Sequence, residues 1–67
     1  MTKEELKNEI RSVIDDRPQW SRLGQFVFNY IDEKYGVART VQYADKVDCY
    51  YDDDKIDLFI EKCSELL

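Results

Sequence analysis

Arg17 to Tyr35 read RPQWSRLGQFVFNYIDEKY, the most apolar segment of this 67-residue chain. It holds the only tryptophan, the only proline and two of the three phenylalanines. At 100° per residue its apolar side chains cover more than half of a helical circumference, so a helix here must be covered from two sides. We therefore expect a central helix over residues 18–35. One face carries Trp20, Leu23, Val27, Tyr30 and Ile31, with Phe26 and Phe28 on its flanks.

The ends of this central helix have local signals. Pro18 suits the first position of a helix, and Asp15 and Asp16 would then lie near its positive end. Gly36 is a typical residue for the position just after a helix. Gly24 lies in the middle of the apolar arc, where a glycine costs about 1 kcal/mol relative to alanine. Its presence predicts that another backbone or ring approaches closely.

A first helix is expected over residues 2–15. Thr2 and Glu5 have the spacing of a capping box, in which each side chain bonds the other residue's backbone N–H. The apolar stripe that follows consists of Leu6, Ile10, Val13 and Ile14.

A last helix is expected from about Asp53 to the end of the sequence. Asp52, Asp53 or Asp54 can serve as its N-cap. Its apolar stripe consists of Ile56, Phe59, Ile60, Cys63, Leu66 and Leu67.

Residues 37–44 are ambiguous. Val37, Val41 and Ala44 share one helical face, but the β-branched residues also permit a strand paired with residues 47–51. We prefer a short helix, because an isolated hairpin is only marginally stable. The sequence thus predicts one all-α domain over residues 1–67, a small bundle of three main helices plus one short helix. Its predicted core is Leu6, Ile10, Val13, Ile14, Trp20, Leu23, Val27, Ile31, Val41, Ile56, Phe59, Ile60 and Cys63.

Composition bounds the function. The chain has no histidine, which argues against catalytic dyads and typical zinc sites, and its two glycines are too far apart for a phosphate-binding loop. We predict no catalytic residue, no cofactor and no metal, and a protein that is not an enzyme. A net charge of −5 also disfavours direct binding to nucleic acid or to anionic membranes.

Two cysteines without CxxC spacing, and no signal peptide or membrane-spanning run, favour a cytoplasmic protein with reduced thiols. Cys63 is expected in the core. The acidic residues between Asp45 and Asp57 lack the central glycine and regular ligand spacing of a calcium loop. We assign them to helix capping and solvated charge.

Five tyrosines are many for so short a chain, and tyrosine is enriched at protein interfaces. We predict a partner surface made of Tyr43, Tyr50 and Tyr51 with the neighbouring Asp48, Asp52 and Asp53. Gln25 and Asn29, four residues apart on the polar strip of the central helix, are predicted to clamp this loop.

These residues resemble a family of small uncharacterised proteins of bacteria and their phages. The resemblance covers residues 17–60 and rests on Arg17-Pro18, Trp20, Gly24-Gln25, Phe28-Asn29, Asp48 and Tyr51-Asp52-Asp53. It implies a compact helical domain in which the central helix meets the Tyr-Asp loop, and it implies no catalytic residue. Cys49 departs from the family pattern, which often has proline there.

The predicted function is a non-enzymatic interaction module that binds another protein or a second copy of itself. The alternative is a phage-type inhibitor whose carboxylates imitate nucleic acid and block a basic host protein.

Overall fold

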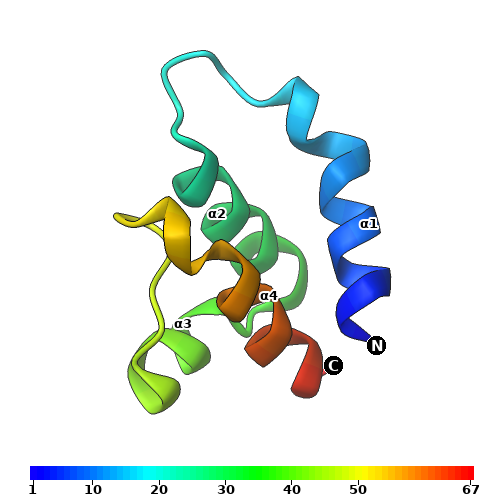
Figure 1. Ribbon diagram of the computed structural model, residues 1–67, viewed down its shortest axis with the longest axis vertical. Helices are drawn as coiled ribbons and strands as arrows, with labels where there is room; N and C mark the ends of the chain where they lie inside the picture. Colours follow the sequence, from blue (N-terminus) through cyan, green and yellow to red (C-terminus); the bar gives the residue numbers. More distant parts are fainter.

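The computed structural model describes residues 1–67 and contains helices and turns but no strand (Figure 1). The main helices are α1 (Lys3–Val13), α2 (Leu23–Tyr35) and α4 (Ile56–Glu65). The short α3 (Ala38–Thr40) continues directly into a π-helix (Val41–Asp45). Two 3₁₀ turns, Ile14–Asp16 and Asp53–Lys55, follow α1 and precede α4. The predicted all-α fold with three main helices and a short one is confirmed.

α1 starts at the predicted capping box. The Glu5 amide donates to the Thr2 hydroxyl (3.1 Å), and the Thr2 amide donates to the Glu5 carboxylate (2.9 Å). Two orphan donors of the first turn are thereby satisfied. Leu6 and Ile10, one turn apart, are buried.

α2 begins at Leu23, so the helix start predicted at Pro18 is wrong. Pro18 instead opens a turn, in which the Ser21 amide donates to the Pro18 carbonyl (3.0 Å). Arg22 is extended, with φ −71° and ψ 156°. The predicted placement of Asp15 and Asp16 at the start of this helix is wrong as well, because they belong to the 3₁₀ turn after α1.

Trp20 is 78% exposed, so its predicted place in the core is wrong. The prediction assumed a helical register that continues back to Pro18. Since residue 20 lies in the turn before α2, that register does not apply to it. The predicted C-terminal signal of α2 is present: Gly36 has φ 72°, and its amide donates to the carbonyls of Ile31 and Asp32.

Residues 38–45 are helical, so the alternative strand over residues 37–44 is wrong. The first turn is an α-turn, and the next five residues form the π-helix, which ends at Lys46 in the left-handed conformation (φ 57°). Ala38 and Val41 are buried. Ala44 is exposed, because a π-turn holds more residues than an α-turn and shifts the register of the predicted face.

α4 packs against α1, so the two ends of the described chain meet. Asp52 caps the 3₁₀ turn that leads into α4, accepting from the Asp54 amide (3.0 Å). Outside the apolar contact, Asp57 of α4 pairs with Lys3 (2.8 Å) and Lys7 (3.4 Å) of α1. None of these helices is long and apolar enough to cross a bilayer.

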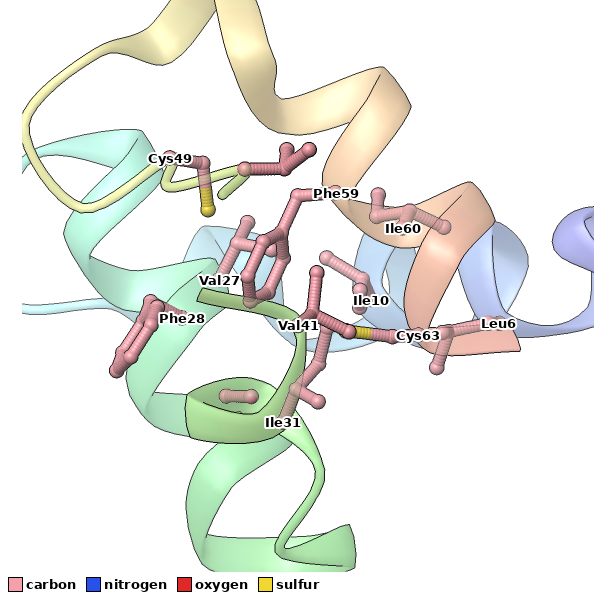
Figure 2. Close-up of a cluster of buried hydrophobic side chains, with 12 residues drawn as sticks. Leu6, Ile10, Val27, Phe28, Ile31, Val41, Cys49, Phe59, Ile60 and Cys63 are labelled. Carbon is pink, nitrogen blue, oxygen red and sulfur yellow. The ribbon is translucent and has the colours of Figure 1, made fainter. Parts of the chain in front are cut away.

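The core is a single cluster of twelve buried apolar residues, ten of which are labelled in Figure 2. Phe59, from α4, is fully buried and lies near the middle of the labelled side chains. Cys63 is buried as predicted. Of the other predicted core residues, Val13, Ile14, Leu23 and Ile56 are only partly buried, whereas Leu66 and Leu67 of the predicted stripe are exposed. Four residues of this cluster were not predicted: Phe28, Ala38, Val47 and Cys49.

One carboxylate joins α1 to α2. Glu9 accepts from the hydroxyls of Tyr35 (2.6 Å) and Tyr30 (2.7 Å) and from the Lys34 ammonium (2.9 Å). These donors, led by the Tyr35 hydroxyl, hold the pKa of Glu9 below its ordinary value. Because the ionised form is favoured in the folded state, this network stabilises the fold above the ordinary glutamate pKa and weakens as pH falls.

We expect the Glu9→Gln variant to lower Tm at pH 7 by about 4–8 °C, the shift that about 1 kcal/mol causes in a domain of this size. The difference between the two proteins should shrink at pH 3, because lowering the pH favours the protonated form of wild-type Glu9 and weakens the same network. Thermal denaturation followed by circular dichroism at both pH values measures it. Glu4→Gln, which removes an exposed unpaired carboxylate of the same helix, should leave Tm almost unchanged at both. An equal Glu9→Gln deficit at pH 7 and pH 3 would contradict the assignment.

Candidate interaction surface

The loop of residues 47–54 lies directly on the first turn of α2. The Gly24 amide donates to the Asp53 carboxylate (2.9 Å), and the Cys49 thiol donates to the Gly24 carbonyl (3.4 Å). A Cβ at residue 24 would lie 1.9 Å from the Cys49 carbonyl oxygen. The close approach predicted for Gly24 is therefore made by the backbone of this loop.

Asp53 takes the place of an N-cap side chain for α2. Arg22, at the N-cap position, makes no side-chain cap bond. The amide of Gly24, two residues into the helix, is one of the donors that an N-cap side chain normally satisfies. A carboxylate 29 residues further along the chain satisfies it here.

Two side chains form hydrogen bonds to Tyr50, one just before α2 and one within its first turn. The Arg22 guanidinium donates to the Tyr50 carbonyl (2.7 Å), and the Gln25 amide donates to the Tyr50 hydroxyl (3.0 Å). Gln25 thus makes the loop contact that was predicted for it. Asn29 does not, because it is exposed and lines a different groove beside Trp20. The predicted clamp consists of Gln25 with Arg22, and Asn29 is no part of it.

The aspartates of the loop accept hydrogen bonds from groups of the same molecule. Asp48 accepts from the Tyr50 amide (2.8 Å) and from the Gln42 side chain (2.9 Å), so it shapes the turn before Tyr50. Asp52 caps the next turn and Asp53 bonds Gly24. No group of three or more acidic or cysteine side chains is arranged to hold a metal ion. The three predicted aspartates therefore fix the loop's conformation.

The three predicted tyrosines line one groove of about 310 Å³, which we call the tyrosine groove. Tyr43 and Tyr51 are 76% and 74% exposed. Tyr50 is only partly buried and packs edge-on against Phe28, with the ring centroids 5.7 Å apart. Its other neighbour is Tyr51, at 4.7 Å between centroids. The groove is lined by Phe28, Arg39, Gln42, Tyr43, Tyr50 and Tyr51.

The π-helix supplies one wall of the tyrosine groove. Gln42 and Tyr43 both belong to it, and Arg39 lies one turn earlier in α3. π-helical turns are rare and often occur at functional sites, where the extra residue redirects side chains. Here Gln42 points to Asp48 and Tyr43 is left in solvent.

Neither thiol is activated. Burial raises the pKa of Cys49 and of Cys63 to about 12, so both are protonated at neutral pH. A protonated, buried thiol is a poor nucleophile and metal ligand. Both cysteines are free and serve as small apolar residues of the core.

Sequence reasoning missed Phe28, Arg39 and Gln42 as parts of this surface. Arg39 and Gln42 are three residues apart in a segment that was correctly expected to be helical, so they share one side of it. The available signal was their proximity to Tyr43, but the π-turn that sets their direction has no recognisable sequence pattern.

No protein-family model, curated protein or solved structure matches this chain.

We expect Gly24→Ala to destabilise the fold by about 1–3 kcal/mol, because the new Cβ overlaps the Cys49 carbonyl. The sign of the change in unfolding free energy is informative, since replacing glycine by alanine in a helix without this neighbour would stabilise the protein by up to about 1 kcal/mol. Urea unfolding followed by circular dichroism measures the change. The control variant Asn8→Ala, on the exposed face of α1, should have an unfolding free energy within about 0.5 kcal/mol of the wild-type value, or a higher one. A more stable Gly24→Ala protein would contradict the loop's position.

A matched pair tests the clamp. Gln25→Ala should cost about 1 kcal/mol, because it removes the bond to the Tyr50 hydroxyl. Asn29→Ala, one turn further along the same helix, should change stability by less than about 0.5 kcal/mol. Urea denaturation of both variants provides the comparison, and equal effects would show that the Gln25 contact does not stabilise the loop.

Proposed function

We propose that this protein is a small cytoplasmic, non-enzymatic interaction module that binds another protein through the tyrosine groove. The observation that carries the proposal is the exposure of Tyr43 and Tyr51, each about three-quarters accessible, at one groove. Tyrosine rings offer a large contact area at low entropic cost and a hydroxyl that still bonds when buried.

The backbone around these rings is held in place before any partner arrives. The peptide of Tyr50 is fixed by Arg22 at its carbonyl and by Asp48 at its amide. The Arg22 guanidinium also lies 5.8 Å from the centroid of the Tyr51 ring. A preformed surface loses less conformational freedom on binding, which supports a role in recognition.

The size of the groove fits a protein side chain. Its volume of about 310 Å³ lies at the lower limit of small-molecule pockets. Its polar groups, Arg39, Gln42 and the tyrosine hydroxyls, are the kinds of group that surround the contact core of protein interfaces.

The mimic of nucleic acid is not favoured by these contacts. It would need carboxylates that are free along one continuous face. Asp48, Asp52 and Asp53 accept internal hydrogen bonds instead, and Asp57 is paired with Lys3 and Lys7. The interaction module is therefore the function that we propose.

Site-specific photo-crosslinking tests the proposal. A photoreactive phenylalanine analogue replaces Tyr43 or Tyr51 in the native host, and Asn8, exposed on α1, serves as the control position. We expect a discrete cross-linked species from positions 43 and 51 and none from position 8. Sedimentation of the purified protein at rising concentration then shows whether that species is a second copy or another protein. The same products from all three positions, or none from 43 and 51, would contradict the proposal.

A further inference from the structure

A second groove, which we call the tryptophan groove, lies between α2 and the turn before it. It also measures about 310 Å³ and shares no lining residue with the tyrosine groove. Four of its residues are at helical spacing i, i+3, i+4 and i+7, so they share one face of α2. The main lining residues are Pro18 and Trp20 from the turn and Phe26, Asn29, Tyr30 and Glu33 from α2.

The walls of this groove are aromatic. Phe26 and Tyr30 stack along α2 with their centroids 6.2 Å apart and their planes 26° from parallel. Trp20 is 78% exposed in the turn that Pro18 and Ser21 close. A tryptophan held in water beside two further rings is a large apolar surface without a partner in this molecule.

The only charge in the groove is negative. Glu33 lines it, is exposed, and pairs with no lysine or arginine of the chain. The neighbouring Lys34 is bound to Glu9 (2.9 Å), and its ammonium lies 5.7 Å from the Tyr30 centroid. Tyr30 therefore contributes mainly packing, whereas the rings of Trp20 and Phe26 have no cation beside them.

We infer that the tryptophan groove binds an arginine side chain of a partner protein. A guanidinium stacks on an indole face and simultaneously bonds a carboxylate with two parallel N–H groups. The groove presents both features, Trp20 and Glu33, and the net charge of −5 draws a basic segment towards it. This site goes beyond the tyrosine groove and does not depend on it.

The protein carries its own reporter for the test, because Trp20 is the only tryptophan. Acetylated, amidated tri-arginine is titrated into the intact protein at constant ionic strength while Trp20 emission is recorded, and the neutral tri-citrulline peptide serves as the ligand control. We expect a saturable change with tri-arginine and none with tri-citrulline.

Two charge-matched variants locate the binding. Glu33→Gln should raise the Kd for tri-arginine by about threefold to fivefold, as loss of an exposed ion pair does. Glu4→Gln changes the net charge equally but lies on α1, and should raise it by less than about twofold. Circular dichroism confirms that both variants are folded.

Three results would overturn the inference. They are the absence of a saturable change in Trp20 emission, equal weakening by Glu33→Gln and Glu4→Gln, and equal binding of tri-citrulline. A Trp20 emission that shifts on dilution without peptide, together with sedimentation as a dimer, would place a second copy in the groove instead. The three overturning results do not bear on cross-linking at positions 43 and 51, so the two proposals fail separately.

Discussion

The carbonyl oxygen of Cys49 contacts Gly24 so closely that a Cβ at residue 24 would overlap it. The rest of the candidate surface depends on that contact. Because the loop backbone touches the helix backbone at Gly24, Asp53 reaches the helix amide and Arg22 reaches the Tyr50 carbonyl. Tyr50 is thereby placed against Phe28, and Tyr51 beside it is left in solvent. The absence of a Cβ at residue 24 thus determines where the rings of Tyr50 and Tyr51 lie.

Local signals predicted the fold correctly wherever the stabilising partner is close in sequence. The capping box at Thr2 and the left-handed Gly36 involve residues within five positions of each other, and both are present. The start of α2 was predicted wrongly because the Gly24 amide in its first turn donates to Asp53, a residue distant in the chain. With the helix beginning at Leu23, Pro18 is free to form a turn and Trp20 leaves the core. Burial of Cys49 follows from the same tertiary contact, and neither Cys49 nor Val47 belongs to a predicted helical stripe.

For the candidate surface, residue type was a better guide than spacing. The three tyrosines of the predicted surface were identified from the number of tyrosines and their interface chemistry, and these three do line one groove. Spacing misplaced Asn29, which is exposed and lines the groove beside Trp20, whereas Gln25 and Phe28 of the same helix contact the loop. The aspartates were expected on a contact surface, but short acidic side chains in a tight loop bond the nearest amides first, as Asp48 and Asp52 do. The position of Gln42 depends on the π-helix, which has no recognisable sequence pattern, and Arg39 lies in the turn that leads into it.

The pairing of α1 with α4 has a consequence for how the chain reaches this structure. Lys3 and Asp57 are in contact across 54 positions, and the buried apolar residues run from Leu6 to Cys63. Bringing such distant segments together costs chain entropy before any burial compensates for it. The buried apolar residues form one cluster drawn from both halves of the chain, so partly formed intermediates have little to stabilise them. We therefore expect folding to be all-or-none, with the amides of α1 and α4 opening to solvent only in the same global event.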